Sequence, residues 1–219
     1  MDQASAPERT RNIIIGPMGL EGILGLPEAS TGIVLFAHGS GSGRFSPRNN
    51  FVARALREAG FATLLFDLLT EDEAQDRANV FDIELLADRL AMAADCVKQD
   101  RETIELPIGY FGASTGAAAA LVAAASATCP IAAVVSRGGR PDLAGSALAR
   151  VTAPTLLIVG GADWTVLELN RAALAELRCE KHLAIVPGAT HLFEEPGTLE
   201  AVVDLASSWF ASHLATAAR

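Results

Sequence analysis

Short runs of hydrophobic residues alternate along the chain with longer stretches in which hydrophobic residues recur every three or four positions. The short runs are bounded by Gly, Pro or Asp and predict strands. The longer stretches predict helices. The expected strands are 33–37, 62–66, 106–111, 131–136, 155–160 and 182–186, and the expected helices are 49–59, 82–98, 115–127, 166–177 and 199–214. This alternation predicts an α/β fold with a mostly parallel sheet covered by helices on both faces.

The beginning of the chain departs from the alternation. Two apolar stretches, 13–15 and 20–26, flank a Gly-rich turn and predict a hairpin. We expect residues 1–11 to form a flexible tail and residues 12–219 to form a single domain without a lid. The polar segment from Leu68 to Ala78 is expected to be a solvated loop, with a mobile flap as the alternative.

Composition and charge argue against several classes of protein function. Half of the 219 residues are hydrophobic, which excludes a disordered chain. The net charge of −9 argues against nucleic acid as a partner, because binding to phosphates requires a basic surface. The Ala-rich run 117–135 is divided by Ser126, Thr128 and Pro130 into pieces too short to span a bilayer, so we expect no membrane partner.

Cysteine usage and the first residues indicate a cytoplasmic protein. Cys96, Cys129 and Cys179 are widely spaced and odd in number, which is typical of reduced thiols. The first nine residues contain an early acid and no apolar run, so we expect no secretory signal. Cys179 and His182 have a ligand-like spacing, but no second pair completes a tetrahedral site, and no metal is expected.

The strongest chemical signal is the sequence Gly-Ala-Ser-Thr-Gly at residues 112–116. It follows an expected strand and precedes an Ala-rich expected helix, which is the context that the G-x-S-x-G nucleophile motif requires. A sharp turn there would hold the Ser114 hydroxyl above the sheet, and a Cβ at 112 or 116 would crowd that turn. An ordinary Gly-rich connection between strand and helix is the alternative interpretation.

A candidate acid and a candidate base follow in the order that this motif predicts. Asp163 comes after the expected strand 155–160, and His191 comes after the strand 182–186. The ends of parallel strands meet at one edge of a sheet, so both side chains should approach Ser114. Asp163 could instead only cap the next helix, and Glu194 or Glu195 could replace it as the acid.

The loop His38-Gly-Ser-Gly-Ser-Gly43 follows the strand 33–37 and suits a second element of the same chemistry. In acyl-transfer enzymes such a loop donates a backbone N–H to the oxyanion, beside the N–H of the residue after the nucleophile. We therefore predict an oxyanion hole from the N–H groups of Ser40 and Thr115. His38 is expected to brace the loop by hydrogen bonds.

The same loop leaves a nucleotide site open as an alternative. A strand, a Gly-rich turn, a helix and a second strand ending at Asp67 are similar to half of a dinucleotide-binding fold. However, Gly39, Gly41 and Gly43 do not form G-x-G-x-x-G, and Arg44 does not complete a P-loop.

Together, residues 38–49, 112–116, 161–163 and 190–193 resemble the α/β-hydrolase fold, in particular the small, lidless group similar to dienelactone hydrolase. The resemblance covers about residues 13–214. It implies a sheet of about eight strands, a Ser or Cys nucleophile, no cofactor, and hydrolysis of small esters or lactones. True dienelactone hydrolases carry Cys at the nucleophile position, so Ser114 favours an ordinary carboxylic ester.

The sequence thus predicts a serine esterase with Ser114, Asp163 and His191 as its triad and a small-molecule ester as its partner. Dienelactone hydrolase or thioesterase activity, a catalytically silent binding module and a nucleotide-binding protein are alternatives. With few aromatic residues and no cap domain, we expect a shallow site for short acyl chains. Candidate substrate contacts are Arg137, Trp164 and Phe193; for Arg137 and Arg140 a surface salt bridge is the favoured alternative. The sequence leaves a monomer and a homodimer open.

Overall fold

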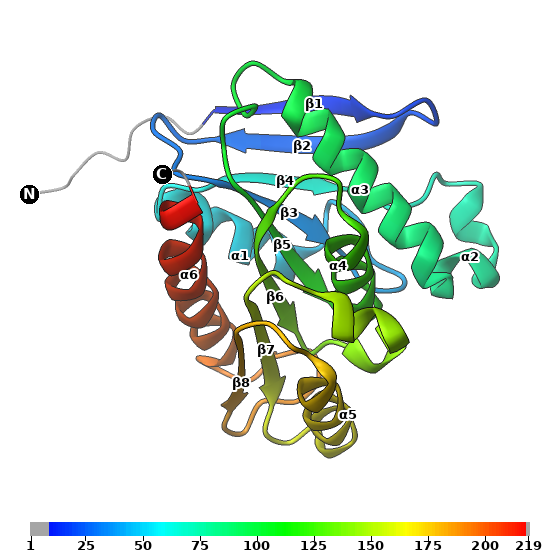
Figure 1. Ribbon diagram of the computed structural model, residues 1–219, viewed down its shortest axis with the longest axis vertical. Helices are drawn as coiled ribbons and strands as arrows, with labels where there is room; N and C mark the ends of the chain where they lie inside the picture. Colours follow the sequence, from blue (N-terminus) through cyan, green and yellow to red (C-terminus); the bar gives the residue numbers. More distant parts are fainter. Residues whose placement is uncertain (1–8, 218–219) are drawn as a thin grey trace, which may run out of the picture.

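The computed structural model describes residues 9–217, and eight strands in this part of the chain form one sheet (Figure 1). Their order across the sheet is β1-β2-β4-β3-β5-β6-β7-β8. The strands from β4 onward in this order pair parallel with one another, and the antiparallel pairs are β1–β2 and β2–β4. The strands are β1 (Arg9–Ile15), β2 (Leu20–Leu26), β3 (Ile33–Ala37), β4 (Ala62–Phe66), β5 (Ile108–Ala113), β6 (Ile131–Arg137), β7 (Thr155–Gly160) and β8 (Lys181–Val186).

The hairpin predicted at the start of the chain is confirmed, but it begins earlier than expected. Strand β1 starts at Arg9, so residues 9–11 of the expected tail belong to the sheet; residues 1–8 of that tail lie outside the described residues. The polar pattern of residues 9–11 does not predict a strand. Residues that are distant in the sequence hold this segment in place. Arg9 forms an ion pair with Glu102, and Arg11 pairs with Asp100.

Helices cover both faces of the sheet, as predicted. Helices α1 (Pro47–Glu58) and α6 (Thr198–Ala217) lie on one face, and α3 (Ile83–Gln99), α4 (Thr115–Ser126) and α5 (Trp164–Glu176) lie on the other (Figure 1). Each layer encloses its own apolar cluster against the sheet. The central helix α4 is almost entirely buried and built mainly of Ala, which lets it approach the strands and α3 closely.

Three short helical segments have no counterpart in the sequence prediction. A 3₁₀ turn, η1 (Glu73–Gln75), and a short helix, α2 (Arg77–Phe81), occupy the segment that was expected to be a loop. Thr70 and Glu73 cap each other there, and Glu73 pairs with Arg89 of α3. The third segment is η2 (Pro141–Arg150), which is interrupted at Gly145. Contacts with other elements stabilise these segments. The spacing of hydrophobic residues along the chain does not reveal such contacts, so it did not predict these helical segments.

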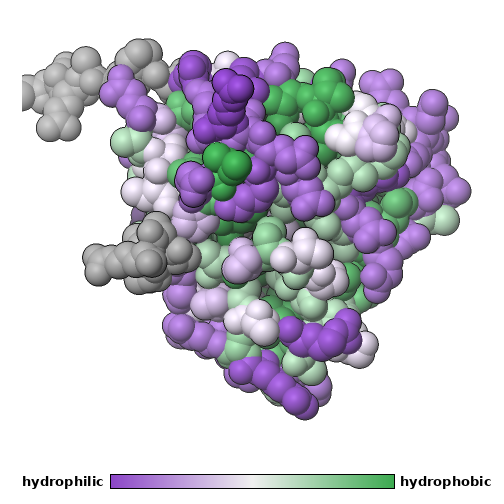
Figure 2. Space-filling view, turned by 45° about the horizontal axis from the view of Figure 1, so that its top comes forward, coloured by the Kyte–Doolittle hydropathy of each residue, from purple (hydrophilic) through white to green (hydrophobic). Residues whose placement is uncertain are grey.

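The surface over the β1–β2 end of the molecule is mainly hydrophilic, and hydrophobic side chains appear on it in separate patches (Figure 2). Within residues 9–217, none of the helices is both long enough and apolar enough to cross a membrane.

Candidate active site

Ser114 lies at the turn between β5 and α4, in a backbone conformation that L-residues rarely adopt. Its φ is 52° and its ψ is −122°, and it is one of two non-glycine residues with positive φ among those described. Such strain persists only where the surrounding structure holds it, and it is typical of functional sites. The Ser114 carbonyl accepts hydrogen bonds from the N–H groups of Ala117 and Arg140, which fix the turn.

The flanking glycines are required by close packing, as the sequence predicted. A Cβ on Gly112 would lie 2.5 Å from the Ala117 Cα, and a Cβ on Gly116 would lie 2.1 Å from the Ala37 carbonyl oxygen at the end of β3. Real Cβ atoms do not approach backbone atoms this closely. The turn therefore packs directly against β3 and the loop that follows it.

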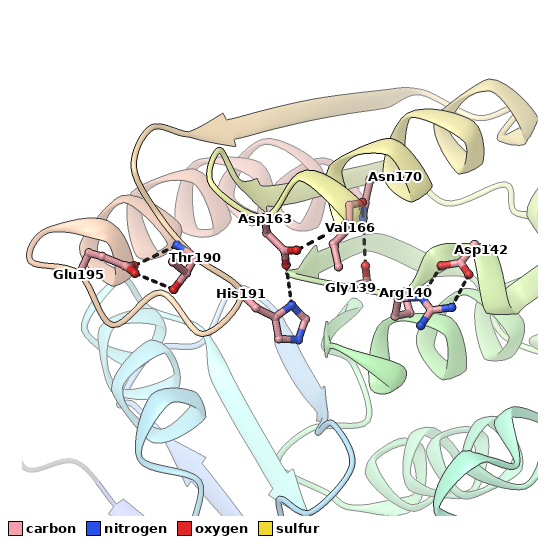
Figure 3. A network of polar contacts seen from close by, with 9 residues as sticks. All are labelled: Gly139, Arg140, Asp142, Asp163, Val166, Asn170, Thr190, His191 and Glu195. Carbon is pink, nitrogen blue, oxygen red and sulfur yellow. Dashed lines mark hydrogen bonds and ion pairs between the residues drawn. The ribbon is translucent and has the colours of Figure 1, made fainter.

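Asp163 and His191 meet at the carboxyl edge of the sheet, where Asp163 follows β7 and His191 follows β8 (Figure 3). The His191 Nδ1 donates to Asp163 Oδ2 over 2.8 Å, because a carboxylate can only accept. This bond fixes the tautomer and leaves Nε2 with a lone pair that can accept a proton. Asp163 Oδ1 accepts from the Val166 N–H at 3.4 Å. One carboxylate thus caps α5 and contacts the imidazole, so the two interpretations of Asp163 are compatible.

Glu194 and Glu195, the alternatives to Asp163 as the acid that orients His191, have other partners. Glu195 accepts hydrogen bonds from the backbone N–H and the hydroxyl of Thr190, next to His191 (Figure 3). These bonds lower the pKa of Glu195. Glu194 pairs with Arg48 of α1. Both glutamates therefore brace the ends of the His191 loop, while Asp163 is the acid that contacts the imidazole.

Ser114 and His191 line one cavity of about 260 Å³, called the smaller cavity below. Within the described part of the chain, no hydrogen bond joins the Ser114 hydroxyl to the His191 ring. Nucleophile and base are often loosely paired in the absence of substrate and come together when it binds. The structure therefore brings all three predicted residues to one edge of the sheet, with the acid–base contact made and the nucleophile–base contact open.

Ser40 and Thr115, the residues predicted to form the oxyanion hole, lie side by side. The Ser40 N–H donates to Thr115 Oγ1 over 3.1 Å. Thr115 is the first residue of α4, and a helix offers no internal partner to its first N–H groups. Gly39 brings this loop against Ser114, since a Cβ at 39 would lie 2.9 Å from the Ser114 Cβ. The Ser40 N–H is thus well placed but already has a partner in this state.

His38 braces the loop that follows β3, as predicted. We call residues 38–46 the β3 loop. The His38 Nε2 accepts from the Leu68 N–H at 3.0 Å, and Nδ1 lies 3.0 Å from the Gly39 carbonyl, to which it donates. Burial lowers the pKa of His38. The neutral imidazole therefore ties the β3 loop to the end of β4.

Arg137 is a buried cation beside the candidate nucleophile, and the interpretation as a surface salt bridge is wrong for it. The residue is 7% exposed and lines the smaller cavity. Its Nη2 donates to Asn49 Oδ1 over 3.3 Å, while its Nε is buried without a partner. Burial, and then repulsion from Arg48, lower the pKa of Arg137 to about 10. Burial arises because β6 ends under α1 and the β8–α6 loop, which the sequence pattern does not show.

Arg140 does form the expected surface salt bridge. Its guanidinium donates two hydrogen bonds to the Asp142 carboxylate, at 2.9 and 2.8 Å (Figure 3). It does not line the smaller cavity.

The other two candidate substrate contacts, Trp164 and Phe193, do not line the smaller cavity. Trp164 begins α5 and is 74% exposed. Phe193 is buried, and the Arg137 guanidinium lies 5.9 Å from the centre of its ring. Sequence reasoning missed Arg48 and Asn49 of α1, which do line the cavity. The only available signal was that α1 begins directly after the β3 loop.

A second cavity, of about 530 Å³, lies on the other side of the β3 loop and is called the larger cavity below. The β1–β2 hairpin and the segment after β4 supply most of its walls. These two segments form a cavity without a cap domain, and the expectation of a shallow site for short acyl chains stays a prediction.

The described residues give no support to a metal or nucleotide site. They contain no cluster of three or more His, Cys, Asp or Glu that could hold a metal. Asp67, which would hold a ribose in a dinucleotide fold, accepts from the Arg44 N–H at 2.7 Å and pairs with the Arg44 guanidinium. Arg44 also pairs with Glu21.

The sheet order, the strained turn at Ser114 and the acid–base pair at the same edge define an α/β-hydrolase. The chain belongs to the dienelactone hydrolase family, whose model matches residues 20–209. A dienelactone hydrolase from Anabaena variabilis has a similar structure, with a TM-score of 0.90 and 55% identity over 96% of this chain and 99% of that one. A lidless serine hydrolase from Xanthomonas campestris shares the fold, with a TM-score of 0.76 and 22% identity over 94% and 96% of the two chains.

The curated relatives carry a different name. In two strains of Mycobacterium tuberculosis, a protein named "Putative phosphoribosyl transferase" is 61% identical over 202 residues, which cover 92% of this chain and 46% of the relative. The chain thus spans about half the length of the curated relatives it matches.

Proposed function

We propose that this chain is a serine hydrolase that cleaves small carboxylic esters or lactones through an acyl-enzyme. The observation that carries the proposal is the shared cavity of Ser114 and His191, together with the Asp163 carboxylate that fixes the His191 tautomer. Membership of the dienelactone hydrolase family supports hydrolysis as the class of reaction.

In the first half of the reaction, Ser114 attacks the ester carbonyl. His191 Nε2 takes the hydroxyl proton as the bond from Oγ to the carbonyl carbon forms, and Asp163 stabilises the resulting imidazolium. The negative charge on the carbonyl oxygen is received by the N–H groups of Thr115 and Ser40. To do so, the Ser40 N–H gives up its hydrogen bond to the Thr115 hydroxyl and donates to the oxyanion instead. His191 then gives its proton to the leaving oxygen, and the ester C–O bond breaks.

In the second half, water replaces the alcohol. His191 takes a proton from water as the new C–O bond forms, and it returns that proton to Ser114 Oγ as the acyl-enzyme bond breaks. The products are a carboxylic acid and a free enzyme in its starting protonation state.

Arg137 is the substrate contact that we retain. Arg137 lines the smaller cavity, and its guanidinium can donate to an anionic or strongly polar group bound there. His191 lines the same cavity and must protonate the leaving oxygen, so Arg137 faces the alcohol part of the substrate.

The alternative functions differ in how many of these features they use. Dienelactone or thioester hydrolysis would proceed on the same triad. A silent binding module would leave the Ser114 strain without a purpose, and a nucleotide site would have to displace Arg44 from Asp67. We do not extend the transferase name of the curated relatives to this chain, because more than half of their length is not matched by it. A cytoplasmic location and a homodimer stay predictions from the sequence.

Covalent labelling tests the proposal directly. Treatment with a fluorophosphonate, followed by intact-protein mass spectrometry and peptide mapping, should give one adduct on Ser114. The His191→Gln variant should label far more slowly, because its serine lacks a base. Absence of an adduct on Ser114 in the unaltered protein would contradict an activated nucleophile.

A further inference from the structure

The larger cavity lies directly beside the proposed catalytic residues but holds none of the triad. Its walls come from the turn of the β1–β2 hairpin, from the β3 loop and from residues 67–74 after β4. Gly39, Ser40 and Ser42 line both cavities, and Thr115 lines the larger one. The proposed oxyanion hole is therefore the boundary between the two cavities.

The position of His191 indicates which cavity receives the alcohol part of an ester and which receives the acyl part. The base must reach the leaving oxygen to protonate it, and His191 lines the smaller cavity but not the larger one. The alcohol part of an ester bound at Ser114 therefore lies in the smaller cavity. The acyl part can then extend past Ser40 into the larger cavity.

The walls of the larger cavity suit a neutral, apolar group. Its floor contains the buried side chains of Leu20, Leu68 and Leu86. Among the described residues that line it, Glu21, Asp67 and Glu71 are acidic, and Arg44 is the one Arg or Lys. Arg44 already pairs with Glu21 and Asp67. A carboxylate on the acyl group would meet an excess of negative charge, so the cavity selects against anionic acyl groups.

We propose that the larger cavity is the acyl-binding subsite and that it selects neutral, apolar acyl chains longer than acetyl. The inference rests on the proposed function, because it takes the reaction at Ser114 as its starting point. A volume of about 530 Å³ is typical of a small-molecule site and exceeds what an acetyl group fills.

Substitutions that fill the cavity test this assignment. Ala74 is exposed on η1 and lines one wall, and Met18 lines the opposite wall in the hairpin turn. Ala74→Trp and Met18→Trp should each block an extended acyl chain without disturbing the core. Ala78→Trp is a matched control, because Ala78 is also exposed but lies in α2, outside the cavity lining.

The assay compares p-nitrophenyl acetate with p-nitrophenyl hexanoate. In the unaltered protein kcat/KM should be at least roughly tenfold higher for hexanoate, since each buried methylene is worth up to about a factor of four. Ala74→Trp and Met18→Trp should remove most of this preference by lowering kcat/KM for hexanoate more than for acetate. Ala78→Trp should change neither. If both filling variants affected the two esters alike, or left the preference intact, the subsite assignment would be wrong.

A binding measurement separates failure of the subsite from failure of the proposed function. Hexanamide binding to Ser114→Ala, followed by calorimetry, needs no turnover. Binding that Ala74→Trp weakens at least about tenfold, and Ala78→Trp does not, supports the cavity as a site for apolar chains. If that result came with no ester hydrolysis and no label on Ser114, the proposed function alone would fall. Absence of hexanamide binding would overturn the subsite itself.

Discussion

Asp163→Asn separates the two tasks of the Asp163 side chain. In the structure, Oδ2 accepts from His191 Nδ1 at 2.8 Å and Oδ1 accepts from the Val166 N–H at 3.4 Å. Asparagine caps a helix about as well as aspartate, so α5 should keep its start. However, an amide NH₂ directed at Nδ1 favours the tautomer with the proton on Nε2, and that tautomer cannot take the Ser114 proton.

The expected magnitudes differ widely for the two tasks. Loss of the correct tautomer should lower kcat by roughly 10⁴, which corresponds to about 5.5 kcal/mol in activation free energy. The capping bond is long, so its contribution lies at the low end of roughly 0.5–2 kcal/mol, and most of it survives in Asn. The free energy of unfolding should therefore change by less than about 0.5 kcal/mol.

The assay combines steady-state hydrolysis of p-nitrophenyl acetate with urea unfolding. Asp163→Ala should lose the same activity and also about 0.5–1 kcal/mol of stability, because the cap is gone. Asp142→Asn is a control that makes the same substitution at another site, since Asp142 pairs with Arg140 and does not line the smaller cavity. Retention of activity within tenfold of the unaltered protein by Asp163→Asn would refute the role of Asp163, as would an equal loss in Asp142→Asn.

Three further predictions concern Ser114, Arg137 and His38. Ser114→Ala should lower kcat at least roughly a thousandfold in the same ester assay, and near-native turnover would reject Ser114 as the nucleophile. Arg137→Met should raise KM at least about tenfold for esters with a carboxylate on the alcohol part but not for neutral esters, because a charge-assisted bond is lost; equal changes would contradict substrate recognition. Burial lowers the pKa of folded His38 below its ordinary 6.5, so the unfolded chain binds the proton first and stability falls as pH drops through that value. Urea unfolding at about pH 7.5 and about pH 5.5 should show a larger loss for the unaltered protein than for His38→Asn, and equal losses would refute the argument.

Local patterns were sufficient to predict the sheet, the five long helices and the placement of Ser114, Asp163 and His191 at one edge of the sheet. The central strands β3 to β7 are short apolar runs with clear boundaries, and parallel strands end at one edge. Ser114, Asp163 and His191 each follow a parallel strand, so their sequence positions alone place them together. The glycines at 112 and 116 could be interpreted in the same way, because their role follows from a turn that the motif itself specifies.

The features that sequence reasoning missed depend on contacts between distant segments. Arg137 is buried because α1 and the loop after β8 cover the end of β6, and its own neighbours in sequence contain no sign of this. Residues 68–78 are rich in polar side chains, yet Leu68 and Leu69 are buried and the segment is fixed through His38 and Arg89. The larger cavity forms because this segment faces the β1–β2 hairpin. The sequence of either segment alone therefore does not predict the cavity.

The larger cavity and the proposed triad are built from different parts of the chain. The β1–β2 hairpin contributes Met18 and Leu20 to the cavity wall but contributes nothing to the proposed proton transfers. Changes in the length or composition of the hairpin turn should therefore alter which substrates are accepted without altering the proposed chemistry at Ser114. Such independence would let natural variation, or a directed library confined to residues 16–21, diversify specificity at little risk to turnover.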